Sequence, residues 1–124
     1  MNKDNNSGIR WITETLKTDE YFLNGAITKL ENGFLLIISE NEYKLGSISI
    51  SIPHKFQVGG ESSTSTTIPI AFGKKNELIS KALGQRLSHK TNSMVISIIN
   101  IDEKNQKMVK DCAKLMDNII EKMY

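Results

Sequence analysis

The chain has 124 residues, a length that suits one folded domain with a core of its own. Its 16 Lys and Arg residues oppose 14 Asp and Glu residues, and the resulting net charge of +2 excludes a strong overall attraction to nucleic acid or membrane surfaces. A single Cys excludes an internal disulfide and a cysteine-based zinc site, and it fits a reducing compartment. Residues 1–7 are polar and Asn-rich and are predicted to be a disordered lead, without the features of a signal peptide. Residues 8–124 are predicted to be a single domain.

The first third of the chain is rich in strand signals. Residues 9–16 are β-branched and favour an edge strand, and residues 21–30 form a second strand in which Gly25 is expected to mark a bulge. Glu31-Asn32-Gly33 predicts a tight hairpin, because Asn-Gly supplies the positive φ angles that such a turn needs. Residues 34–39, FLLIIS, are continuously apolar and predict a central strand buried on both faces.

The stretch from Leu45 to Ile52 alternates isoleucine with serine. This alternation predicts a strand with one apolar face and one wet face. Pro53 ends the strand, because proline lacks the backbone donor that a ladder requires.

Two shorter segments follow. Residues 57–67, QVGGESSTSTT, are rich in Gly, Ser and Thr and predict a mobile loop. Residues 68–72 predict a short strand, and Pro69 places it at an edge or a bulge. Gly73 is expected to be the hinge into the next helix.

The stretch from Asn76 to Asn100 predicts a helix, a tight turn and a strand. Asn92 suits the left-handed position that ends a helix, after a basic last turn. The strand at residues 94–99, MVISII, has apolar residues on both faces, so it must be covered on both. The helix has an apolar stripe at helical spacing, made of Leu78, Ile79, Ala82, Leu83 and Leu87.

A final helix is predicted after Asp102, which is a good N-cap. Its two faces are separated by character, as expected of a helix that lies on a core. The apolar face consists of Val109, Cys112, Met116, Ile119, Ile120 and Met123.

Residues with catalytic or ligating chemistry are sparse. His54 and His89 stand far apart and in no metal or catalytic spacing, and Cys112 lies on an apolar helix stripe, where a buried small hydrophobe is the default. Residues 59–63, GGESS, suggest a phosphate loop but lack its Lys-Ser/Thr pair. The sequence therefore predicts a non-enzymatic protein with no catalytic residue, cofactor or metal site.

The apolar strands lead to a prediction about assembly. About six strands and two helices are expected, and two helices cover only one face of such a sheet. The other face would carry an apolar patch larger than monomers tolerate, so a second sheet from a partner chain is expected to pack against it. The pattern does not decide which side of each strand faces the partner. The predicted dimer-interface residues are Leu35, Ile37, Val95, Ser97 and Ile99.

A basic set of residues surrounds the first helix. Lys74, Lys75, Arg86 and Lys90 are predicted to bind a partner, as a docking patch for an acidic protein surface. The alternative function is a small nucleic-acid-binding or generic dimerisation module that uses this basic helix face. No aromatic residues interleave with the basic ones, as single-strand binders require, so this alternative ranks second.

One stretch of the chain resembles a known family. Residues 82–92, ALGQRLSHKTN, followed by Val95 in a strand, are similar to the signature of the proteasome assembly chaperone 4 family, and the chaperone 3 type is the close runner-up. Residues 30–35, LENGFL, and the Phe72-Gly73 step before the helix are similar too. The resemblance covers residues 16–101. Two features depart from the family: Gly84, which costs about 1 kcal/mol in a helix unless something packs closely there, and the long polar loop at 57–67.

The resemblance implies an α+β fold, with a six-stranded antiparallel sheet, two helices on one face and the second face packed against a partner sheet. It implies a chaperone that binds proteasome α-subunits and promotes assembly of the 20S α-ring. The implied partners are a chaperone 3-like subunit in a heterodimer, or a second copy of the chain in a homodimer. Neither nucleic acid nor membrane is expected as a partner. The expected location is the cytoplasm, with the nucleus as a second location.

Overall fold

The computed structural model describes residues 8–53, 66–70 and 76–123. Within these residues, six strands form one sheet in the order β1-β2-β3-β6-β4-β5, and two helices pack on it. The elements are β1 (Trp11–Lys17), β2 (Phe22–Leu30), β3 (Gly33–Glu40), β4 (Ser47–Ile52), β5 (Thr66–Ile70), α1 (Glu77–Thr91), β6 (Met94–Asn100) and α2 (Gln106–Met123).

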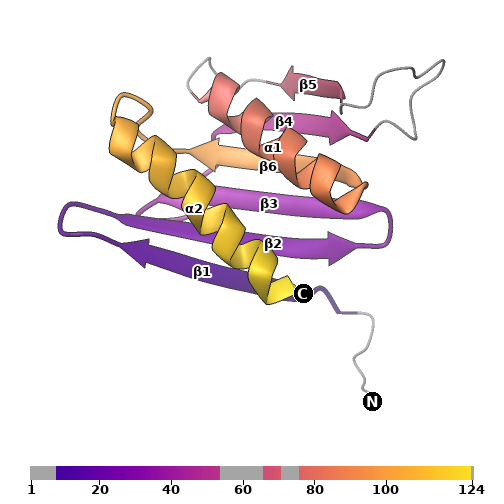
Figure 1. Cartoon of the computed structure of the whole chain (residues 1–124), viewed down its shortest axis with the longest axis horizontal. Coiled ribbons are helices and arrows are strands. Elements are labelled where there is room, and N and C mark those ends of the chain that lie inside the picture. The colour runs from indigo at the N-terminus through magenta and orange to yellow at the C-terminus, as the bar shows by residue number, and fades with distance from the viewer. Residues whose placement is uncertain (1–7, 54–65, 71–75, 124) are drawn as a thin grey trace.

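Both helices lie on the same face of the sheet (Figure 1). Helix α2 crosses β1 and β2, whereas α1 lies over β4, β5 and β6. The two helices thus divide one face between them. This confirms the expected α+β class and the expected placement of the helices.

The sheet is mixed, so the expectation of a purely antiparallel sheet is wrong. The central strands β3 and β6 run parallel, with Leu35 opposite Ile96, and the other neighbours are antiparallel. The chain leaves β3, passes through β4 and β5, and returns along α1 before it enters β6. A helix that crosses back over the sheet is the usual way to bring a later strand in parallel to an earlier one.

The hairpin between β2 and β3 forms where the sequence predicts it, but for a different reason. Leu30 pairs with Gly33, so the loop consists of Glu31 and Asn32, and Asn32 does not have a positive φ. Gly33 is required by its neighbour instead: a Cβ at this position would collide with the backbone oxygen of Met94 in β6.

Gly25 does not mark a bulge, because the ladder continues through it: Gly25 pairs with Glu14 on one side and Ile38 on the other. A Cβ at Gly25 would lie 2.7 Å from Cδ1 of Ile119. The missing side chain lets α2 pack closely on β2.

Asparagine residues hold both ends of α1. Asn92 ends the helix in the left-handed conformation, at φ 52°, as predicted. At the start, Asn76 also has a positive φ, and its buried side chain makes two hydrogen bonds to the backbone of Ile101, each of 3.0 Å. Glu103 accepts the backbone N–H of Asn76 at 3.1 Å. The start of α1 is thereby fixed to the segment that follows β6.

Helix α2 begins later than predicted. Asn105, not Asp102, is the capping residue, because its Oδ1 accepts the N–H of Met108 at 3.1 Å. Asp102 stabilises the preceding turn, where its Oδ1 accepts the N–H of Lys104 at 3.1 Å. The shift moves the helix start by one turn.

Several predictions fall wholly or partly outside the described residues: the lead at residues 1–7, His54, most of the loop at 57–67 and Gly73. Thr66 and Thr67 belong to β5, so the predicted loop is too long at its end. β5 is an edge strand of the sheet, as Pro69 predicted.

Candidate interaction surface

The burial pattern fixes which side of each central strand faces the helices. Val95, Ser97 and Ile99 of β6 are fully buried beneath the helices, at 0% exposure, whereas Ile96 on the opposite side is 38% exposed. In β3, the odd-numbered Leu35 and Ile37 are only half-buried, while the residues between them are buried. The side of the sheet away from the helices is called the open face below.

This geometry corrects part of the predicted dimer interface. Val95, Ser97 and Ile99 cannot reach a partner chain, because the helices of their own chain cover them completely. The sequence pattern could not decide the side, since both sides of β6 are apolar. Leu35 and Ile37 lie on the open face, and their place in a dimer interface stays a prediction.

The two sides of strand β4 face the opposite way from what its alternation of isoleucine and serine predicts. Its serines, the wet face by composition, are buried, and its isoleucines are half-buried on the open face. The reason lies in α1, which places Gly84 directly over β4 and β6. A Cβ at Gly84 would lie 2.7 Å from Oγ of Ser51 and 2.9 Å from Oγ of Ser97. As the sequence analysis anticipated for Gly84, another part of the chain packs closely against the helix at this residue.

Hydrogen bonds satisfy the buried serines beneath α1. The hydroxyls of Ser49 and Ser97 are 2.6 Å apart, and that of Ser49 lies 3.0 Å from that of Ser80 in α1. Ser49 and Ser97 both donate to the backbone oxygen of Ser80, at 3.0 Å each. We call Ser49, Ser80, Ser97 and Gly84 the serine seam. Because its polar groups are paired, burying them carries no large penalty, and the isoleucines of β4 are left to the open face.

On the open face, apolar side chains align in rows across β3, β6 and β4. One row joins Leu35, Ile96 and Ile50, and the next joins Ile37, Ile98 and Ile48. Such rows of branched side chains form a flat, contiguous apolar surface. A surface of this kind is uncommon on a monomer and typical of an interaction site.

The neighbouring strands β1 and β2 add both polar and apolar side chains to the open face, among them Phe22 and Leu30, which are 44% and 40% exposed. Thr15 donates to Oδ1 of Asn24 at 2.7 Å, and the Lys17 ammonium lies 5.5 Å from the centre of the Phe22 ring. The border of the open face thus mixes apolar side chains with polar and cationic ones, and protein–protein interfaces likewise have polar side chains at the rim.

The predicted basic docking patch is only partly described. Lys74 and Lys75 lie outside the described residues. Arg86 is paired with Asp117 of α2, at 2.7 Å, which joins the two helices and offsets its charge. Lys90 is exposed near the end of α1. A role for these residues in partner binding stays a prediction.

Burial raises the pKa values of Cys112 and Tyr21, two side chains close to Asp111. Cys112 is fully buried, as predicted, and its burial, with the nearby Asp111 charge, raises the thiol pKa to about 12. Burial and a 2.6 Å hydrogen bond to Asp111 raise the pKa of Tyr21 to about 12. His89 is exposed near the end of α1, as expected. In the described ranges, no group of three or more His, Cys, Asp or Glu side chains could hold a metal ion.

Sequence reasoning missed the isoleucines of β4 and the even-numbered isoleucines of β6. A usable signal was present in α1, where Ser80, Gly84 and Ser88 recur at a spacing of four residues and are buried. A stripe of small residues on a helix requires a surface of small residues beneath it, and the serines of β4 supply one.

The comparisons with known proteins bear on the fold. A scan against models of protein families gives no match for this sequence, and neither does a search of curated proteins. Among the described residues, no helix is long and apolar enough to cross a bilayer. A search of solved structures finds the crystal structure of a chaperone complex for yeast 20S proteasome assembly, with a TM-score of 0.61 and 13% sequence identity. The match covers 90% of this chain and 97% of the other. The chain thus shares the fold of a subunit of that complex.

Proposed function

We propose that this protein is a non-enzymatic chaperone that dimerises through its open face and binds proteasome α-subunits, so that it promotes assembly of the 20S α-ring. The apolar open face carries the proposal. Its two rows of Leu and Ile side chains need cover that the described helices, both on the opposite face, do not supply. The fold shared with a chaperone complex for yeast 20S proteasome assembly indicates the process.

The partner on the open face is proposed to be another sheet of the same kind. Two sheets that pack face to face lie about 10 Å apart and interdigitate their side chains. A second copy of this chain would meet that requirement, and so would a chaperone 3-like subunit with a similar apolar face. The resemblance of residues 82–92 to the proteasome assembly chaperone 4 family supports the heterodimer.

Affinity capture of the tagged chain from its own cells, followed by mass spectrometry, tests the function. We expect proteasome α-subunits and a small chaperone partner in the captured material, without the full set of β-subunits. Ile37→Asp, which puts a charge in the centre of the open face, should lose the chaperone partner. Leu78→Asp is the matched control, because Leu78 is 78% exposed on the helix side of the molecule. Capture of finished 20S particles alone, or of no α-subunit, would contradict the proposal.

A further inference from the structure

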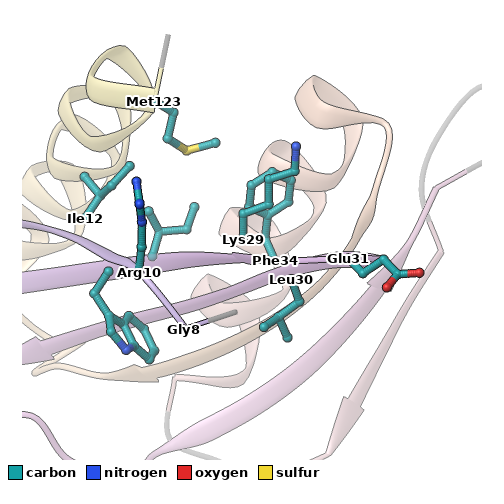
Figure 2. Close-up of a pocket in the computed structure, with 10 residues that line it drawn as sticks. Gly8, Arg10, Ile12, Lys29, Leu30, Glu31, Phe34 and Met123 are labelled. Atoms are coloured by element: carbon teal, nitrogen blue, oxygen red, sulfur yellow. The ribbon is translucent and has the colours of Figure 1, made fainter. Parts of the chain in front are cut away.

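A hollow of about 650 Å³ lies where α2 ends above the sheet. Its lining includes Ile12, Ile27 and Phe34 from three adjacent strands, with Met123 from the end of α2 (Figure 2). We call it the end pocket. Its volume falls in the range of sites that hold a small ligand or one or two side chains. It is too small for a folded domain, so its occupant must be a small molecule or a short segment of chain.

Two cationic side chains stand at the mouth of the end pocket. Arg10 and Lys29 both line it, and Figure 2 shows them rising from the same side of the sheet, with Met123 between and above them. Neither forms an ion pair within the described residues. Glu31 lines the pocket as well, but its carboxylate extends sideways, away from both cations (Figure 2).

The strand register explains why these cations lie beside an apolar hollow. Trp11 pairs with Thr28, so the next position along places Arg10 opposite Lys29, and a 2.6 Å hydrogen bond from Thr28 to the backbone oxygen of Arg10 holds the strand end in place. On the other side, Lys29 pairs with the buried Phe34. Like charges opposite each other on neighbouring strands are unfavourable. An anion bound between Arg10 and Lys29 would offset the repulsion between their charges.

We propose that the end pocket binds a short acidic segment of a partner protein, with an apolar side chain in the hollow and a carboxylate between Arg10 and Lys29. Both cations select for a carboxylate, and the guanidinium of Arg10 can hold it through two hydrogen bonds. The aliphatic and aromatic walls select for an apolar neighbour of that carboxylate. The proposal stands apart from the chaperone role, since peptide binding is measured on the purified chain without any proteasome subunit.

The chain carries its own reporter of occupancy. Trp11 is the single Trp of the sequence and it lines the pocket. The full-length protein is titrated with a capped peptide, GSLFDEDG amide, and the Trp fluorescence is followed. We expect saturable binding that weakens as salt is raised. The peptide GSLFNQNG amide, in which the carboxylates become amides, should bind about ten-fold more weakly.

Variants locate the site. The double variant Arg10→Gln and Lys29→Gln should weaken binding of the acidic peptide about ten-fold, because it removes both charge-assisted contacts. The matched control is Lys107→Gln with Lys114→Gln, which makes the same change in net charge on exposed positions of α2 and should leave the affinity unchanged. Circular dichroism should show that both variants are folded.

Four results would overturn the proposal. The first is equal affinity for the acidic and the amide peptides, and the second is an equal loss in both double variants. In the third, the peptide leaves the Trp11 fluorescence unchanged, whereas the substitution Asp4→Asn changes this fluorescence clearly. That result would assign the pocket to the chain's own leading segment. Binding of anionic vesicles, without peptide binding, would likewise reject a protein segment as the ligand.

Discussion

The two helices cover the same face of the sheet with different contacts. The contact of α2 is made of large apolar side chains and includes Leu115, Met116 and Ile119, all fully buried. The contact of α1 alternates leucine with the small residues of the serine seam. A large apolar contact holds its helix through buried surface. A contact of small polar residues holds its helix through close approach and hydrogen-bonded hydroxyls. In this contact the isoleucines of β4 face away from the helix.

This difference decides what the other face of the sheet looks like. Beneath α2, strand β2 turns Leu23 and Ile27 toward the helix, and its opposite side mixes polar residues such as Asn24 with the exposed apolar Phe22 and Leu30. Beneath α1, strand β4 turns serine toward the helix and isoleucine away from it. The isoleucines of β4 therefore lie on the open face, behind the helix that places small residues on the sheet.

The largest expected effect tests the α2 contact. Leu115→Ala should lower the free energy of unfolding by about 3 kcal/mol, because it removes a fully buried side chain and leaves a cavity. Urea denaturation of the purified chain measures this value. Leu78→Ala, on an exposed position of α1, is the control and should cost less than about 0.5 kcal/mol. A loss below about 1 kcal/mol for Leu115→Ala would show that α2 is not the main apolar contact.

The next effect tests the close approach of α1. Gly84→Val should cost about 2 kcal/mol, because its Cβ would collide with the hydroxyls of Ser51 and Ser97. Ala82→Val places the same residue on an exposed position of the same helix and should cost only about 0.6 kcal/mol, from helix propensity. Thermal denaturation of both variants gives the comparison. Equal costs at the two positions would mean that α1 does not rest on the serines.

The smallest effect is a pH dependence on the α2 side, where Tyr21 donates to Asp111. Burial and this hydrogen bond raise the pKa of Tyr21 from 10.0 to about 12 in the folded chain. The stabilisation is complete below the unfolded pKa, and it should be lost as the pH rises from 10 toward 12. Urea denaturation from pH 9 to 11.5 measures it.

Cys112 titrates in the same range, so this experiment uses Cys112→Ala as the parent chain. In that parent, Tyr21→Phe should remove most of the decline in the free energy of unfolding between pH 10 and 11.5. If the decline is just as steep in the Phe variant, Tyr21 does not retain its proton in the folded state, and the hydrogen bond to Asp111 is not stabilising.

Most of the architecture could be predicted from local signals. The two continuously apolar strands lie side by side in the centre of the sheet, Asn92 ends α1, and Pro69 lies in an edge strand. These predictions depend on patterns within a few residues. The parallel pairing of β3 and β6 could not be obtained in this way, because it depends on where the chain re-enters the sheet after α1.

The candidate surface was harder to predict than the fold. Met94–Asn100 has apolar residues on both sides, so its pattern cannot say that Val95 faces the helices and Ile96 the open face. The alternation of β4 was clear, but its serines are buried because Gly84, which has no side chain, lets α1 pack closely over them. A prediction of that contact requires two segments far apart in the sequence to be considered together.

The central claim is that the open face needs cover from another chain. The most direct test is the mass of the purified protein in solution, by sedimentation or by light scattering after size exclusion, with Ile96→Asp measured beside it. We expect the unmodified chain to have a mass above the 13.9 kDa of a monomer, and we expect Ile96→Asp to have the monomer mass. A folded, unmodified chain that stays at 13.9 kDa at all concentrations, both alone and mixed with the small chaperone partner captured from its own cells, would contradict the claim.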